Sequence, residues 1–360
     1  MTSLPAGLEL RPLTVPDRID AADASDFREM SRVRNLVYAE VSGHTDHDVP
    51  ADELLGMYRP DPSRARFTWV AVWHGRVVGR VGLDLPQEDG ARTAMWLIEL
   101  LREAWGHGIG RAAFDLVERA ARAHGRRVLQ SWAEHPAADG PRLGAPTGFG
   151  SIPADRAARF LVANGCSLEQ IVRVSAYDLT ADPARLGALL AEAEVASAGY
   201  RVVQWEFPTP PEFVDDFATM KARMVTDAPS ADLEYDEETW DATRVRRYEA
   251  SYVDVGRRVL VTAAQHVDSG ELAAFNELTI GKDLSRPTFQ EDTLVVASHR
   301  GHRLGMLVKC AGLLAWRGIA PDSPRVITYN AEENRPMLSI NERIGFIPTS
   351  YEGVWKKVLA

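Results

Sequence analysis

The stretch EDTLVVAS (residues 291–298), followed by HRGHRLG (299–305) and an apolar run to Trp316, decides the fold of this chain. Its first part is β-branched and apolar, which predicts a strand, and the glycine-bearing turn after it leads into a predicted helix. A helix that begins at such a turn directs its free N–H groups and the positive end of its dipole at the loop. Arg300, His302 and Arg303 add side-chain donors. The stretch therefore predicts an anion site, most simply a phosphate site.

The composition limits the function classes. The 360 residues carry a net charge of −10 and are 45% hydrophobic, so two globular domains of roughly 150–200 residues each are expected. The negative charge disfavours nucleic acid and anionic membranes as partners and favours a small cationic partner. Two cysteines, Cys166 and Cys310, predict neither a disulfide framework nor a metal site. Without a signal pattern or an apolar run of ~18 residues, we expect a cytoplasmic protein.

An internal repeat sets the domain organisation. GHGIG (106–110) aligns with GHRLG (301–305), an offset of 301 − 106 = 195, and FLVANGC (160–166) aligns with INERIGF (340–346). Each copy is predicted to run strand, helix, hairpin, strand, glycine turn, helix, strand, helix, strand. The predicted fold class is α/β, with two tandem domains, 1–180 and 200–360, that each hold a mixed β-sheet flanked by helices. Residues 181–199 are expected to form a linker helix.

Both glycine turns resemble the pyrophosphate loop Arg/Gln-x-x-Gly-x-Gly/Ala of the GNAT superfamily of acyl-CoA N-acyltransferases. RGHRLG (300–305) has Arg303 at the middle glycine, and WGHGIG (105–110) starts with Trp105. The segment TYNAEENRPMLSINERIGF (328–346) is similar to the family's strand–helix element, in which an asparagine after the strand contacts the cofactor arm. The resemblance covers nearly the whole chain as two copies, an arrangement similar to that of the mycothiol synthases.

The resemblance implies that acetyl-CoA is the acyl-donor substrate, with its pyrophosphate on the loop and its pantetheine on the main chain of the preceding strand. The positions that match the cofactor-binding pattern are Leu294, Val295, Val296, Arg300, Gly301, His302, Arg303, Leu304, Gly305, Asn330 and Asn334. The first copy lacks the asparagine pair, so the C-terminal domain is predicted to be catalytic and the N-terminal domain a scaffold. Intact Gly108 and Gly110 keep the reverse assignment open.

Amine acylation needs a base, and the family often places a carboxylate on the strand before the loop. Asp292 is the favoured candidate and Glu277, on the preceding hairpin strand, the next. Strand alternation puts Glu291 and Asp292 on opposite faces, so at most one of them is expected to face the site. For each of these carboxylates, an exposed residue without a catalytic role is the alternative.

The leaving thiolate needs an acid, which in the family is usually a tyrosine early in the last helix. Here that position is Asn341, which could hydrogen-bond the sulfur. Tyr329, Tyr351 and water remain alternatives for the acid.

An acidic segment lies between the first two helices of the second copy, where family members often shape the acceptor pocket. Asp227, Asp232 and Glu234 are its candidate substrate-binding residues, and a solvated helix N-terminus is the alternative interpretation. The sequence thus predicts an N-acetyltransferase for a small-molecule primary amine, by direct attack in a ternary complex. A catalytically silent acyl-CoA-binding module and a nucleotide-binding protein remain alternatives, as do a monomer and a homodimer.

Overall fold

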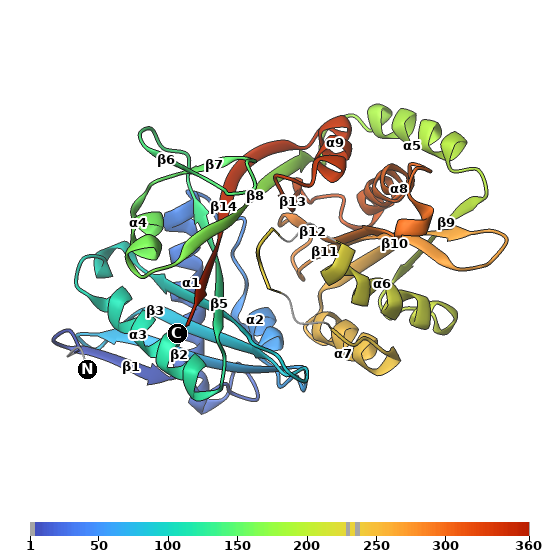
Figure 1. Ribbon diagram of the computed structural model, residues 1–360. Helices are drawn as coiled ribbons and strands as arrows, with labels where there is room; N and C mark the ends of the chain where they lie inside the picture. The colour runs from blue at the N-terminus through green and yellow to red at the C-terminus, as the bar shows by residue number, and fades with distance from the viewer. Residues whose placement is uncertain (1–3, 228–230, 235–237, 360) are drawn as a thin grey trace. The chain divides into compact units, whose positions relative to one another are not determined.

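The computed structural model describes residues 4–227, 231–234 and 238–359, with side chains 225–227 outside the description. The chain folds as two compact units (Figure 1). Unit 1 holds Met1–Val172, Ser230–Asp236 and Ser350–Ala360, and unit 2 holds Arg173–Pro229 and Glu237–Thr349. The expected domains, 1–180 and 200–360, are each one continuous range, whereas unit 1 also takes in Ser230–Asp236 and Ser350–Ala360.

Unit 1 has a sheet whose strands come from both ends of the chain. Its elements are β1 (Leu8–Pro12), η1 (Ala22–Ala24), α1 (Ser25–Ser42), α2 (Ala51–Met57), β2 (Arg64–Trp73), β3 (Arg76–Pro86), β4 (Thr93–Leu100), η2 (Arg102–Ala104), α3 (Ile109–Ala123), β5 (Val128–His135), β6 (Arg142–Gly144), β7 (Ser151–Pro153) and α4 (Arg156–Ala163), with parts of β8 (Ser167–Asp178) and β14 (Ile347–Val358). The sheet order is β1-β2-β3-β4-β5-β14-β8.

Two of the apolar clusters in unit 1 lie on opposite sides of its sheet. Phe27 and Met30 of α1 pack on Val70 of β2 in one cluster. Phe114 of α3 and Leu129 of β5 pack in the other, which also includes Trp355 of β14. Since successive strand residues point to opposite faces, both faces of the sheet are covered by helices.

Unit 2 repeats this pattern with other elements. They are α5 (Ala184–Ala196), β9 (Tyr200–Glu206), η3 (Pro211–Phe213), α6 (Val214–Asp227), α7 (Ala242–Val253), β10 (Arg258–His266), β11 (Leu272–Ile280), β12 (Thr288–Val295), η4 (Ala297–His299), α8 (Leu304–Ile319), β13 (Arg325–Ala331) and α9 (Arg335–Ile344). The sheet order is β14-β8-β13-β12-β11-β10-β9, where β8 and β14 again contribute parts.

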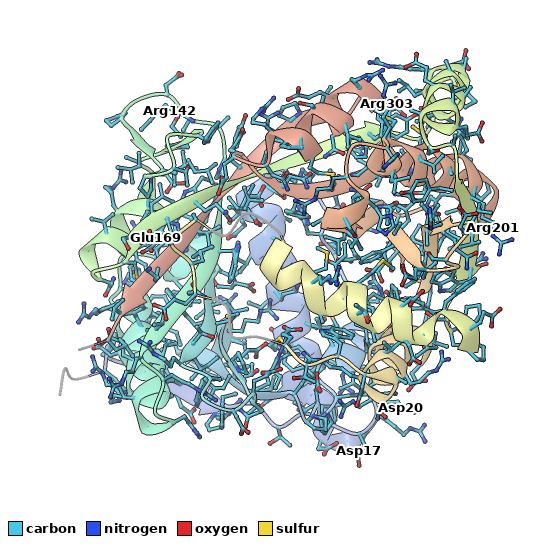
Figure 2. All side chains as sticks on the ribbon, turned by 45° about the vertical axis from the view of Figure 1, so that its right-hand side comes forward. Asp17, Asp20, Arg142, Glu169, Arg201 and Arg303 are labelled. Atoms are coloured by element: carbon cyan, nitrogen blue, oxygen red, sulfur yellow. The ribbon has the colours of Figure 1, made fainter. Side chains whose placement is uncertain are left out.

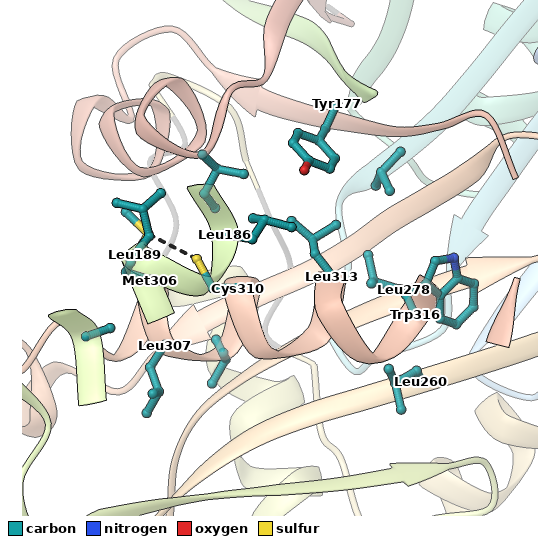
Figure 3. Close-up of a cluster of buried hydrophobic side chains, with 14 of the residues drawn as sticks. Tyr177, Leu186, Leu189, Leu260, Leu278, Met306, Leu307, Cys310, Leu313 and Trp316 are labelled. Carbon is teal, nitrogen blue, oxygen red and sulfur yellow. Dashed lines mark hydrogen bonds between the residues drawn. The ribbon is translucent and has the colours of Figure 1, made fainter. Parts of the chain in front are cut away.

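Helix α8 is the centre of the larger apolar cluster in unit 2. Leu307 and Leu313 of α8 pack between the sheet and α5, which contributes Leu186 and Leu189 (Figure 3). The expected linker helix is therefore α5, and it belongs to the core of unit 2. Helices α6 and α7 lie on the other side of the sheet, where Phe217 packs on Phe275.

The predicted α/β fold class, with a mixed sheet flanked by helices in each half, is confirmed. The last strand of the chain, which the predicted range 200–360 includes, belongs largely to unit 1. Tyr351–Val358 of β14 pairs antiparallel with Val128–His135 of β5 and lies in unit 1. Among the described helices, none is both long and apolar enough to cross a membrane.

Candidate functional site

Strands β12 and β13 pair over only part of their length. Thr288–Gln290 pairs in parallel with Val326–Thr328, while β12 continues to Val295 without further described pairing to β13. On its other edge, β12 continues to pair with β11 as far as Val295. The backbone edge from Glu291 to Val295 is therefore available to an extended ligand, as an unpaired sheet edge is. Arg300 Nε donates to the carbonyl of Val295 at 3.3 Å on this stretch.

The loop after β12 has two residues with left-handed backbone conformation, and one of these two is an arginine instead of a glycine. Gly301 has φ of 93° and Arg303, the N-cap of α8, has φ of 54°. Gly108 occupies the matching position before α3 with φ of 78°. The first-turn N–H groups of α8 face this loop, which suits an anion. The Arg303 side chain is half exposed (Figure 2). Its guanidinium lies 3.5 Å from the Glu192 carboxylate of α5.

The other loop residues pack against the protein. A Cβ on Gly305 would lie 2.9 Å from Ile340 Cδ1, so glycine allows α9 to approach α8. Leu304 is buried in the core. The His302 ring lies 5.4 Å from the ring of Tyr200.

A buried polar chain runs beside the point where β12 and β13 diverge. Lys309 Nζ donates to Asn341 Oδ1 at 2.7 Å, and Asn341 Nδ2 donates to Asn330 Oδ1 at 2.7 Å. Lys309 has no exposed surface and Asn341 is 1% exposed. Asn334 instead caps α9, because its Oδ1 accepts from Met337 N. Asn330 and Asn341 are thus brought together.

A lysine and carboxylates meet on the opposite side of β12. Lys221 Nζ of α6 lies 2.5 Å from Asp292 Oδ2 and 3.2 Å from Glu277 Oε2. The Tyr248 hydroxyl of α7 donates to Glu277 at 3.3 Å. The Glu277 side chain is fully buried, whereas the Asp292 side chain is 34% exposed. The structure therefore brings both predicted base candidates into one cluster.

The charges in this cluster set its proton affinity. Burial raises the pKa of Glu277 to about 7, while Lys221 acts to lower it and Asp292 and Glu291 act to raise it further. Burial acts to lower the pKa of Lys221, but Asp292 and Glu277 hold it above its ordinary value. Lys221 is therefore charged at neutral pH, and Glu277 exchanges its proton near neutrality.

Glu291 lies closer to this cluster than alternation predicts. The β11–β12 register shifts between Asn276 and Leu278, which is a bulge opposite Glu291 and Asp292. Both carboxylates raise the pKa of Tyr248, as does burial, which has the largest effect. The expectation that only one of them faces the cluster does not hold at a bulge.

Two of the three predicted acceptor-binding residues belong to unit 1. Asp232 and Glu234 belong to unit 1, where Asp232 pairs with Lys356 and the backbone of Glu234 bonds the Gln130 amide. The side chain of Asp227 lies outside the described residues. Of the predicted site carboxylates, Glu277 of β11 and Asp292 of β12 lie beside the diverging strands.

The prediction from sequence missed Lys221, Tyr248 and Lys309. Lys221 and Tyr248 join the cluster only through the packing of α6 and α7, which no local pattern indicates. Lys309 had a signal, because it interrupts the apolar run of α8 at the position where the first repeat has Phe114. Among the described residues, no group of three potential metal ligands is present.

Comparison with known proteins identifies this arrangement. Residues 31–140 match the acetyltransferase (GNAT) family. The whole chain resembles a tandem GNAT protein from the clavulanic acid biosynthesis pathway, with 27% identity, 98% of each chain covered and a TM-score of 0.74. Residues 31–140 thus match the GNAT family, and the chain as a whole has the tandem GNAT arrangement of that solved structure.

Two further structures share the fold. A GCN5-related N-acetyltransferase from Sphaerobacter thermophilus is 15% identical, with 99% of this chain and 97% of that chain covered and a TM-score of 0.65. The glucosamine N-acetyltransferase region of a fungal multi-domain β-N-acetylglucosaminidase is 15% identical, with 98% and 38% covered and a TM-score of 0.60. No curated protein matches the sequence. The family match lies within unit 1, the half that the sequence predicts to be a scaffold.

Proposed function

We propose that the protein is an acetyl-CoA-dependent N-acetyltransferase that acetylates a primary amine of a small cationic metabolite or antibiotic-like acceptor. The main support is that unit 2 joins three features on β12: an unpaired backbone edge, a helix N-terminus directly after it, and a lysine–carboxylate cluster on its side chains. An acyl-CoA has an extended amide arm and a pyrophosphate, which match the edge and the helix N-terminus.

In this proposal the main chain of Leu294, Val295 and Val296 pairs with the pantetheine arm. The pyrophosphate oxygens accept hydrogen bonds from the N–H groups in the first turn of α8. Arg300 and Arg303 donate charge-assisted hydrogen bonds to the same oxygens. Arg300 exchanges its present bond to the Val295 carbonyl for the ligand, and Arg303 exchanges its weak surface contact with Glu192.

The acceptor amine approaches the exposed carboxylate of Asp292, which attracts its ammonium group. Glu277 takes up the released proton, because its pKa of about 7 suits a base that works at neutral pH. The amine nitrogen then attacks the thioester carbonyl in a ternary complex, and the carbon–sulfur bond breaks with its electron pair on sulfur. The second proton that the nitrogen loses as it becomes an amide goes to solvent water. In this proposal Asn341 of α9 hydrogen-bonds the leaving sulfur.

An assay of CoA release with acetyl-CoA and a panel of polyamines, amino sugars and aminoglycosides tests the function. Asp292→Asn and Glu277→Gln are each expected to lower kcat by roughly 10²- to 10⁴-fold, the usual contribution of a general base. Glu206→Gln, which alters an exposed ion pair with Arg258, is the matched control. Tight acetyl-CoA binding without release on any amine would instead establish a silent acyl-CoA-binding module.

A second candidate places the transfer in unit 1, and the family match to residues 31–140 favours it. The loop there keeps glycine at 106, 108 and 110. Arg300→Ala separates the two candidates: it raises the KM for acetyl-CoA if unit 2 is the working site. An unchanged KM would assign the reaction to unit 1.

A further inference from the structure

The face of the unit 2 sheet that packs on α8 is polar where the matching face of unit 1 is apolar. The 195-residue offset aligns β11, β12 and α8 with β3, β4 and α3, and an offset of 341 − 161 = 180 aligns α9 with α4. The aligned pairs are Asn276 with Val81, Thr293 with Ile98, Lys309 with Phe114, and Asn341 with Leu161. In unit 1 all four positions belong to the apolar cluster around α3 or pack against it. The fold therefore does not require polar residues there.

These polar groups are incompletely paired. The Lys309 ammonium has three donors and, among the described residues, one acceptor, Asn341 Oδ1. Asn276 Oδ1 and Gln290 Oε1 are buried without a described partner. Burying such groups costs stability, most of all for a charged one. Because unit 1 has apolar residues at these positions and avoids this loss of stability, the polar residues of unit 2 indicate a role other than folding.

The geometry shows where the charge of Lys309 acts. An ammonium group on an amide oxygen polarises that amide and makes its N–H groups stronger donors. The donor in question is Asn341 Nδ2, which contacts Asn330 Oδ1 at 2.7 Å. Asn330 follows Thr328, the last residue of β13 that pairs with β12. The polarised donor thus lies beside the diverging strands.

We propose that Lys309 is a positioning residue for acyl transfer: it orients and polarises the Asn341 amide, which donates a hydrogen bond to the thiolate sulfur as CoA leaves. This inference rests on the proposed function. The carbon–sulfur bond breaks with its electron pair on sulfur, the amine proton goes to the carboxylate cluster, and water protonates the thiolate on release.

The groups around Lys309 set the pH at which it loses its charge. Burial lowers its pKa to about 7. Helix α8 adds the Cys310 thiol, which acts to raise this pKa, and the facing strands add uncharged amides and hydroxyls. On α9, Arg343 pairs with Glu192 and acts to lower the pKa of Cys310. The ammonium is present below this pKa and lost above it, so kcat falls as pH rises through about 7.

Lys309→Met and Asn341→Asp test the proposal in the full chain, with exposed Lys282→Met as control. Lys309→Met is expected to lower kcat roughly 10- to 100-fold, less than the loss of a direct transition-state donor, with little change in the KM for acetyl-CoA. It also removes the fall in kcat above neutral pH. Asn341→Asp is expected to lower kcat as well, because a carboxylate has no N–H to donate to the sulfur. Wild-type kcat and pH profile in Lys309→Met would overturn the proposal.

A binding measurement keeps this test separate from the test of function. Calorimetry at pH 7 gives the ratio of the Kd for acetyl-CoA to the Kd for CoA, whose free thiol can ionise. This ratio is expected to be severalfold larger for wild type than for Lys309→Met, because the wild-type protein binds CoA more tightly relative to acetyl-CoA. Equal ratios would overturn the role of Lys309. Binding of both ligands with no transfer to any amine, but with unequal ratios, would overturn only the proposed function.

Discussion

Units 1 and 2 differ most at the helix that follows the glycine turn. Phe114 of α3 is fully buried among apolar side chains, whereas Lys309 of α8 is fully buried against Asn341. Both positions lie on the helix face that packs toward the sheet. The fold therefore specifies a large buried side chain at this place and leaves its polarity free. Two copies of one fold can in this way diverge into an apolar scaffold and a polar site.

The glycine turns before α3 and α8 also differ, in the residue that has the left-handed conformation. Unit 1 has glycine where the backbone is left-handed, and unit 2 has Arg303 in that conformation. A left-handed non-glycine residue costs roughly 1–2 kcal/mol. Unit 2 thus carries both a strained turn and a buried lysine, whereas unit 1 carries neither at these positions.

The largest expected effect comes from exchanging the buried residues. Phe114→Lys is expected to lower the stability of unit 1 by about 3–5 kcal/mol, because it leaves an unpaired charge in an apolar core. Lys309→Met is expected to be neutral or stabilising by about 1–4 kcal/mol, because it removes a buried charge. Thermal or denaturant unfolding of each variant measures both changes. A destabilised Lys309→Met would show that the lysine is a structural requirement after all.

The pH dependence of stability is the next effect in size. The pKa of Lys309 is about 7 in the folded chain against 10.5 for a free side chain. Between these values the unfolded chain binds the proton and the folded chain does not, so folding stability rises with pH. Relative to Lys309→Met, wild type should gain about 1.4 kcal/mol per pH unit at most over this range. Parallel stability curves for the two proteins would show that Lys309 does not titrate as described.

The smallest expected effects concern the two turns. Gly108→Ala is expected to destabilise unit 1 by about 1 kcal/mol, because alanine disfavours the left-handed conformation. Arg303→Gly is expected to stabilise unit 2 by up to about 1 kcal/mol, since its exposed contact with Glu192 contributes little. Thermal unfolding with an Arg303→Ala control separates backbone strain from loss of charge. A destabilising Arg303→Gly would assign the arginine a structural bond.

The repeat and its glycine turns made the tandem α/β fold predictable, because periodicity and turn residues are local signals. The same signals placed Asp292 and Glu277 near each other on adjacent strands. They could not reveal the bulge that moves Glu291 toward Asp292, or Lys221 arriving from α6, because both depend on tertiary packing. Lys309 was open to prediction only by comparing the repeats position by position.

A crystal structure with bound CoA tests the central claim, that acyl transfer takes place in unit 2. The account predicts the pyrophosphate on residues 300–305, the pantetheine along the β12 edge from Leu294 to Val296, and the sulfur within hydrogen-bonding distance of Asn341 Nδ2. CoA bound only at the turn of residues 105–110 in unit 1, with the diverging strands of unit 2 unchanged, would contradict it.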